Sequence, residues 1–454
     1  MRRKRGFRVS GMVVIAGLAA VLARGVAAET LEEALAKAYM TNPQLLAEQA
    51  ALRATDEDVP QALAGWRPTV TLSGEAGTEH IDSETSRQDR QPTLAEVEVT
   101  QPLYRGGRTT EEVARAESEV LAGRAQLHTI EQTVLLAAVG AYMNVVRDLA
   151  VLELNRNNEV RLRRQLQAAQ DRFRVGEITR TDVAQAEARL SGATAARIQA
   201  EGALVSSRAA YRAVIGDTPG TLSRPTLAVT LPAVETEAQT RAEATSPEVV
   251  RASFLVESAR HSVGVVRGEL LPTLQLRGSL TTERETTGPD SHRDTAGLFA
   301  ELSIPLYQGG GVYARLRAAK ETLGQRLEEL DDSRRAAIER ATSAWNNLET
   351  ARAAVESFRD EVRANEIALD GVQREALVGS RTVLDVLDAE QELLDSRVNL
   401  VRSERDEVVA RFELKAAVGE LTARDLGLAV ELYDSERNYR EVRDKWFGAE
   451  KPAR

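Results

Sequence analysis

Apolar residues recur in steps of three and four over unusually long stretches of this chain. From residue 113 onward they form one series, Val113, Ala116, Val120, Gly123, Leu127, Ile130, Val134, Ala137 and Ala141. This spacing predicts a helix whose seam of small side chains packs closely against another helix. The intervals 103–218 and 306–451 contain no proline. We therefore expect two long helical hairpins, at about 108–216 and 311–419, with one uninterrupted helix over Arg108–Arg174, roughly 100 Å long.

Four shorter segments instead alternate strictly between apolar and polar residues. The pattern is strongest at 273–281, where Leu274, Leu276 and Leu280 share one face, and at 297–306. It is weaker at 70–76 and 95–100. Alternation with a period of two is typical of strands with one apolar and one wet face. We expect strands at about 67–81, 93–104, 271–283 and 296–307, each pair joined by a polar tip.

The two halves of the chain are repeats of one another. Val175–Leu190 reads VGEITRTDVAQAEARL, and eight of its residues recur 203 positions later in Val378–Leu393, VGSRTVLDVLDAEQEL. The predicted organisation is a first repeat over 29–216, a linker over 217–240, a second repeat over 241–427 and a charged C-terminal tail over 428–454. Its charge favours partial disorder from residue 434 onward.

Each copy of the repeated motif predicts a turn between two helices. Gly379 can adopt the left-handed backbone angles that end a helix. The Thr382 hydroxyl or the Asp385 carboxylate can cap the free N–H groups of the helix that follows.

The first 28 residues have the pattern of a secretory signal peptide, with a short N-terminal anchor as the alternative. A basic segment, MRRKRGFR, precedes the apolar run GMVVIAGLAAVLA and small residues before Glu29. Removing this segment, with six basic and no acidic residues, changes the formal charge from −10 to about −16. Such a negative charge argues against a nucleic-acid partner.

Two absences narrow the possible architectures. The chain contains no cysteine, which excludes disulfides and an N-terminal lipid-acceptor cysteine. After the signal segment no stretch approaches 18 consecutive apolar residues, so we expect no transmembrane helix. If the protein crosses a membrane, the strands must form the part that crosses it. Four strands do not close a barrel, which needs about eight, so strands from several copies would have to combine. The alternative is a soluble sheet covered by another part of the same chain.

The double repeat resembles the TolC family of outer-membrane efflux and type I secretion channels, and in particular its non-lipidated, TolC-like members. The resemblance rests on the turn motif, on PLYxGG after each strand pair (Pro102–Gly107 and Pro305–Gly310), and on Phe412–Leu426, FELKAAVGELTARDL. It implies a mainly α fold with membrane β: a homotrimer whose protomers each give four strands to a twelve-stranded outer-membrane β-barrel. That barrel would join a periplasmic α-helical coiled-coil barrel, with the linker in an equatorial region.

The resemblance also implies two roles for the turns. Hairpins of a periplasmic adaptor protein would dock on their apolar and glycine positions: Val175, Gly176, Ile178, Val378, Gly379 and Val383. In the closed state Arg381 would pair with Thr181 or Asp182 on a neighbouring hairpin. Asp385 and Asp388 would line the pore constriction as carboxylate rings, which attract cations and repel anions.

Two observations bear on this assignment. The plainer alternative is that Asp182, Asp385 and Asp388 only complement the N-terminus of a helix. Ala376 stands where family members often place a tyrosine of the closing network, so the closed state would rest more on Arg381 or be looser.

No arrangement of residues indicates an enzyme, a metal or a cofactor. The four histidines are scattered without ligand spacing, and the GGG at 309–311 lacks the Lys-Ser/Thr of a phosphate loop. An exported hydrolase would need a convergent site that the sequence does not show.

The predicted function is therefore an exit duct in the outer membrane of a Gram-negative bacterium, in contact with its lipid and extending into the periplasm. It would pass drugs or a secreted protein from an inner-membrane transporter of RND, ABC or MFS type, through the adaptor, to the exterior. A periplasmic coiled-coil scaffold without a pore is the alternative. Among possible cargoes, drugs, metal ions and secreted protein all remain open.

Overall fold

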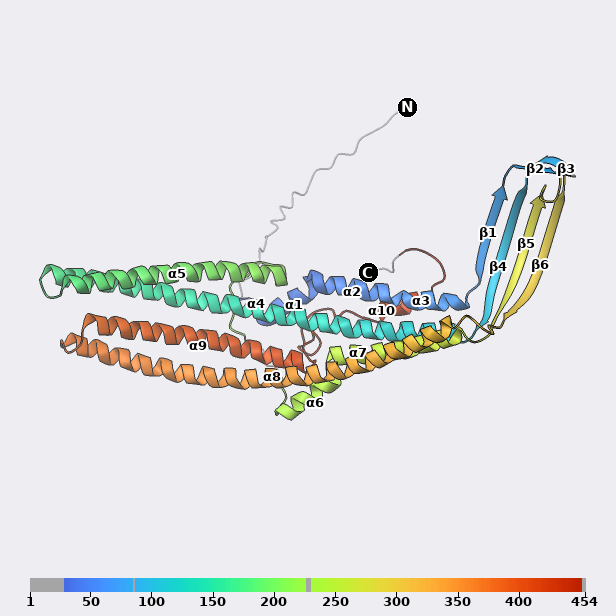
Figure 1. Ribbon diagram of the computed structural model, residues 1–454. Coiled ribbons are helices and arrows are strands. Elements are labelled where there is room, and N and C mark those ends of the chain that lie inside the picture. Colours follow the sequence, from blue (N-terminus) through green and yellow to red (C-terminus); the bar gives the residue numbers. More distant parts are fainter. Residues whose placement is uncertain (1–27, 85, 226–229, 451–454) are drawn as a thin grey trace, which may run out of the picture.

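The computed structural model describes residues 28–84, 86–225 and 230–450. The predicted signal peptide, except for Ala28, lies outside these residues. The molecule is elongated, with long helices over most of its length and a strand sheet at one end (Figure 1). One end of the molecule is therefore formed by strands and the other by helices.

The first repeat begins with short helices and ends in a long hairpin. Its elements are α1 (Leu31–Thr41), α2 (Pro43–Asp56), α3 (Asp58–Leu63), the 3-10 turn η1 (Ala64–Trp66), β1 (Thr69–Ala76), β4 (Thr93–Arg105), α4 (Arg108–Arg174) and α5 (Arg180–Ile215). The continuous helix expected between Arg108 and Arg174 is confirmed, with 67 residues.

The second repeat has the same order of elements. It comprises α6 (Glu235–Thr245), α7 (Pro247–Gly268), β5 (Thr273–Arg284), β6 (His292–Ser303), α8 (Gly311–Leu377) and α9 (Val383–Ala417). Helix α8 also has 67 residues, and α9 has 35 residues against 36 in α5. The equal lengths bring both hairpin tips to the same end of the molecule, opposite the sheet (Figure 1).

The four long strands form one antiparallel sheet in the order β1-β4-β5-β6. The strand expected over about 67–81 is interrupted, because β1 ends at Ala76 and pairing restarts in a separate ribbon of β2 (Glu79–Ser83) and β3 (Ser86–Arg90). Opposite charges support this ribbon, with Arg90 Nε donating to Glu79 Oε2 at 2.8 Å. The polar tip of the first strand pair is thus itself a hairpin.

The sheet extends beyond the helices (Figure 1). Many of its apolar side chains are exposed. Leu72 is 75% exposed and Leu298 76%. The alternative of a sheet covered within the same chain is therefore wrong for the described residues. An uncovered apolar face of this kind requires lipid or another copy of the chain.

The largest core surrounds the middle of α4. Leu135, Val139 and Tyr142 are fully buried there against Leu35 of α1 and Tyr211 of α5. Helix α4 contains an 18-residue window apolar enough to meet the length and composition criteria of a membrane-spanning helix, although no transmembrane helix was expected from the sequence. Half of that window is buried inside the structure. Its apolar side chains pack against other helices, as in the core helix of a soluble bundle.

The corner between β4 and α4 depends on close backbone contact. Gly106 has φ +67°, and a Cβ built there would lie 2.3 Å from the Gly268 carbonyl oxygen of α7. Only glycine fits both the left-handed angle and this contact. The two glycines fix how the sheet joins the helical part.

The described part of the C-terminal tail, 428–450, has a defined structure, so the expectation of partial disorder from residue 434 is wrong for 434–450. The short helix α10 (Arg437–Val442) packs on α2, where Val442 is fully buried and Asn438 Nδ2 donates to Asp56 Oδ2 at 2.8 Å. Its charges are also paired, with Arg443 3.1 Å from Glu117 of α4. Because most residues from 434 onward are charged, the sequence did not indicate that Asn438 and Val442 would be buried.

Candidate functional site at the helical tips

The two tips are turns of nearly identical backbone geometry. Gly176 has φ +77° and Gly379 φ +81°, as expected from the sequence. The Gly176 N–H donates to the Phe173 carbonyl and the Gly379 N–H to the Ala376 carbonyl. Both turns thereby satisfy carbonyls at the end of the preceding helix, which makes the tips defined structures.

A capping box starts the helix after each turn. The Thr179 hydroxyl accepts from the Asp182 N–H, and the Asp182 carboxylate accepts from the Thr179 N–H at 2.8 Å. Thr382 and Asp385 repeat this arrangement. The donated N–H groups hold the pKa of both aspartates below its ordinary value. Within one protomer, Asp182 and Asp385 therefore act as helix caps, the plainer of the two roles considered above.

An arginine–glutamate pair spans each turn, with the charges exchanged between tips. Arg172 of α4 pairs with Glu177 at 2.6 Å. In the other tip Arg381 is the turn residue and pairs with Glu375 of α8 at 2.9 Å. Inside one protomer Arg381 thus contacts neither Thr181 nor Asp182, and the Thr181 side chain is exposed.

Two polar contacts join the first hairpin to the second near the tips. Arg189 of α5 forms an ion pair with Asp388 of α9, 199 residues away. Further from the tips, Gln165 of α4 donates to Glu390 of α9 at 2.7 Å. Sequence reasoning missed both pairs. Asp388 is exposed and belongs to an inter-hairpin contact, whereas Asp385 belongs to a cap.

The residues assigned to adaptor docking differ in accessibility. Val175 is 78% exposed and Val378 81%, and nothing lies within 4 Å of a Cβ built on Gly176 or Gly379. Ile178 is half-buried. Val383 packs against a small core of Leu162, Ala193 and Leu387. Four of the six positions are therefore freely accessible at the tips.

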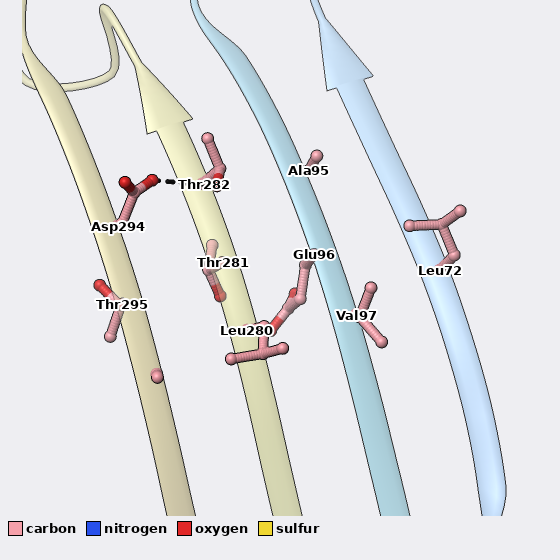
Figure 2. A pocket seen from close by; sticks show the side chains of 10 residues that line it. Leu72, Ala95, Glu96, Val97, Leu280, Thr281, Thr282, Asp294 and Thr295 are labelled. Atoms are coloured by element: carbon pink, nitrogen blue, oxygen red, sulfur yellow. Dashed lines mark hydrogen bonds between the residues drawn. The ribbon is translucent and has the colours of Figure 1, made fainter.

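At the opposite end of the molecule, the sheet separates apolar from polar rows. Leu72, Val97, Leu280 and Ala296 lie directly opposite one another across the four strands. The neighbouring row is Ser73, Glu96, Thr281 and Thr295 and points to the other face. Figure 2 shows several of these side chains on adjacent strands, with the Thr282–Asp294 hydrogen bond near the tip.

A charged cluster lies on the polar face. Arg277 of β5 is 2.8 Å from Glu301 of β6 and 3.7 Å from Glu98 of β4. The Phe299 ring lies on the same face, 5.8 Å from the Arg277 guanidinium. This face is suited to water, and the other face to lipid.

No group of three or more His, Asp and Glu side chains in the described part of the chain is arranged to hold a metal ion. The four histidines each lie beside a single carboxylate: Asp89 for His80, Glu131 for His128, Glu111 for His261 and Asp294 for His292.

Comparison with known sequences identifies the family. The sequence model of the outer membrane efflux protein family matches residues 34–217 and 239–420, which are the two repeats. The chain belongs to the outer membrane efflux protein family. It is 38% identical over 427 residues to the outer membrane efflux protein BepC of Brucella suis, covering 93% of this chain and 92% of BepC. It is 24% identical to TolC of Escherichia coli, covering 88% of this chain and 84% of TolC.

Solved structures share the fold. The Campylobacter jejuni CmeC outer membrane channel has a TM-score of 0.78 at 15% identity, covering 92% of this chain and 89% of CmeC. For the Vibrio cholerae outer membrane protein VceC the TM-score is 0.75 at 18% identity, covering 86% of this chain and 96% of VceC.

The family membership decides between the two functions considered above. Outer membrane efflux proteins are channel proteins, so this chain is an outer-membrane export channel that extends through the periplasm. Channels of this fold are homotrimers that work with periplasmic adaptor proteins and inner-membrane transporters in tripartite systems. A scaffold without a pore does not fit this membership.

Proposed function

We propose that the hairpin tips of this outer membrane efflux protein form its periplasmic gate and that its strands line the exit to the exterior. In the trimer, the polar rows with Glu98, Arg277 and Glu301 face the lumen, and the apolar rows face lipid. The alternation of rows across all four strands supports this orientation. The protein has no catalytic role, and the transport energy comes from its inner-membrane partner.

The gate is the finer part of this proposal. Threefold symmetry would bring three copies of Asp385 and Asp388 around the pore axis, where carboxylates select for cations. Because Arg189 pairs with Asp388 within one protomer, release of this contact would both free the carboxylate and let the second hairpin move away from the first. The Arg189–Asp388 pair is the observation that carries this assignment.

Adaptor docking is proposed at the exposed part of the tips, formed by Val175, Gly176, Val378 and Gly379. Ile178 and Val383, which are partly buried, would join this surface only when the second hairpin moves. Adaptor binding and gate opening would then be coupled, because the adaptor would gain contacts in the open state alone. The cargo we propose is drugs or a secreted protein, delivered by the partner transporter.

The experiment uses the absence of cysteine from the chain. The trimer of the Asp388→Cys variant is reconstituted in planar bilayers and treated with a charged methanethiosulfonate reagent. If Asp388 lines the constriction, the single-channel current falls in up to three steps. Gln185→Cys, at the matching position of the first repeat, is the control and keeps its current. A current that the reagent leaves unchanged in Asp388→Cys would contradict the gate assignment.

A further inference from the structure

Two large aromatic side chains are exposed side by side in the C-terminal segment. Trp446 is 58% exposed and Phe447 87%, and their ring centroids are 6.4 Å apart. Adjacent exposed aromatic side chains are unusual on a surface that faces only water, and they often indicate a binding surface. This pair has no part in the gate or in the pore.

The aromatic pair is held in place by contacts on both sides. On the N-terminal side, α10 is anchored by the buried Val442 and by the hydrogen bond from Asn438 to Asp56. At the pair itself, Arg67 Nη1 donates to the Lys445 carbonyl at 2.8 Å, and the Arg67 guanidinium lies 4.9 Å from the centre of a Trp446 ring. The segment is therefore a built element of the fold.

These contacts place the pair at the base of the sheet. Arg67 lies two residues before the start of β1 at Thr69. The segment after α10 loops out beside α3, on the side of the molecule that leads to the strands (Figure 1). Other exposed apolar side chains gather at the same level, where the strands begin or end: Trp66, Leu103, Tyr104, Leu306 and Tyr307.

We propose that Trp446 and Phe447 insert into the periplasmic leaflet of the outer membrane, at the boundary between phospholipid headgroups and acyl chains. The strands cross this membrane, and the helices extend from it into the periplasm. The base of the sheet therefore lies at the boundary between headgroups and acyl chains of the periplasmic leaflet. Tryptophan and phenylalanine suit the boundary because their rings are apolar, and the tryptophan N–H reaches polar headgroups. Arg67 and Lys445 supply positive charge for the phosphates beside the aromatic pair.

The two repeats differ at this point, which singles out the first. Arg67 corresponds to Leu271 in the second repeat, and Leu271 has no guanidinium to hold a tail segment. Each protomer therefore contributes one aromatic pair, and a trimer contributes three. No cysteine is present to carry a lipid, so anchoring of the periplasmic rim of the barrel would rest on side chains such as these.

The test exploits the three tryptophans of the chain, Trp66, Trp345 and Trp446. Three full-length variants each retain one of them, with the other two changed to phenylalanine, and are reconstituted into phosphatidylethanolamine–phosphatidylglycerol vesicles. Nitroxide labels are carried by the lipids, either close to the headgroup or deep in the acyl chain. The fluorescence of Trp446 should fall about twofold with the shallow label and less with the deep one. The fluorescence of Trp345, half-buried on α8, should not change.

This inference rests on the placement of the strands in the outer membrane, and Trp66 separates the two. If the shallow label quenches Trp66 but not Trp446, the aromatic anchor is wrong while the strand placement stands. If neither is quenched, the strand placement itself fails. Quenching of Trp446 by aqueous iodide alone would overturn the proposal. Shielding from both quenchers would also overturn it, since a neighbouring protomer would then cover the pair.

A second variant tests the role of Arg67. Arg67→Leu introduces the residue of the second repeat and should reduce lipid quenching of Trp446 at least by half, with Trp66 unchanged. Arg437→Ala is the matched control, because among the described residues the Arg437 side chain pairs only with Glu441, within α10. Trimer content and far-UV circular dichroism of both variants are compared with those of the parent. Unchanged Trp446 quenching in a folded Arg67→Leu trimer would show that Arg67 does not hold the segment.

Discussion

Gln165 of α4 donates a hydrogen bond of 2.7 Å to one carboxylate oxygen of Glu390 on α9, and thereby joins the two hairpins of one protomer. Glu390 is only 5% exposed. Its second oxygen and the Gln165 amide oxygen have no hydrogen-bond partner among the described residues. A proton on Glu390 would supply the missing donor for this pair.

Glu390→Gln should stabilise the contact between α4 and α9 at neutral pH. The new amide can donate to Gln165 Oε1 and still accept from Gln165 Nε2, so a buried unsatisfied group is removed, for a gain of about 1–2 kcal/mol. Glu187→Gln is the matched control: it is the equivalent position of the first repeat, and its side chain is exposed. The measurement is thermal unfolding of the detergent-solubilised trimer, and equal effects of the two variants would contradict the prediction.

The same contact should depend on pH. Burial raises the pKa of Glu390 above its ordinary value of 4.5, and the charge of Arg161 opposes this only in part. The folded state then binds more protons than the unfolded state between 4.5 and the raised pKa, so stability falls as the pH rises through that window. Unfolding temperatures should be higher near pH 5 than at pH 7 in the parent, and this difference should shrink in Glu390→Gln.

Gly106→Ala should destabilise the protein more than Gly309→Ala, the corresponding change in the second repeat. Both glycines have positive φ, +67° and +62°, so both changes carry backbone strain of about 1 kcal/mol. Only at Gly106 would the new Cβ lie 2.3 Å from a backbone oxygen, which adds roughly 1–3 kcal/mol. The fraction of heat-resistant trimer on a gel, measured against temperature, compares the two, and identical curves would refute the close contact at Gly268.

Thr382→Ala should loosen the start of α9 without affecting the first tip. The change removes the hydroxyl that caps the Asp385 N–H and costs about 1 kcal/mol of local stability. Hydrogen exchange should accelerate in the amides of residues 383–386, and Thr179→Ala should produce the same effect in α5 alone. Acceleration spread over both hairpins would show that the two caps are coupled.

Acidic pH should destabilise the start of the helix that follows each tip. The pKa of Asp182 and of Asp385 is lowered in the folded state, so each carboxylate contributes stability above its ordinary pKa of 3.8 and loses it as the pH falls through the lowered value. This acid effect is opposite in sign to that of Glu390. The protection factors of the amides at the two caps, which correct for the pH dependence of intrinsic exchange, should therefore be unchanged near pH 5 and fall only under more acidic conditions.

Most of the fold could be predicted from local patterns in the sequence. The proline-free intervals and the spacing of Val113, Ala116 and Val120 predicted α4 with its true ends, because helices depend on local periodicity. Gly379 and Thr382 were identifiable because turn and cap chemistry requires their residue types. The break in the first strand was not expected, although Gly77, directly after β1, marks it.

Contacts between distant segments could not be predicted in the same way. Arg189 and Asp388 are 199 residues apart, and their pairing depends on how two hairpins pack side by side. Partial disorder was predicted from residue 434 onward because charged residues outnumber apolar residues there. Its order rests on a few positions such as Asn438, which donates to Asp56 of α2, and Arg443, which pairs with Glu117 of α4, both far earlier in the chain.

The measurement that tests this account most directly is the single-channel conductance of the purified trimer in planar bilayers. The parent should form a pore of small conductance. Arg381→Ala should raise it severalfold, because the family resemblance pairs Arg381 in the closed trimer with Thr181 or Asp182 of a neighbouring hairpin, a contact that this change removes. Arg172→Ala, which breaks only the corresponding pair of the first tip, is the matched control and should change it little. A folded trimer that forms no pore in any variant would contradict the channel itself, and a pore unaffected by Arg381→Ala would contradict its gate.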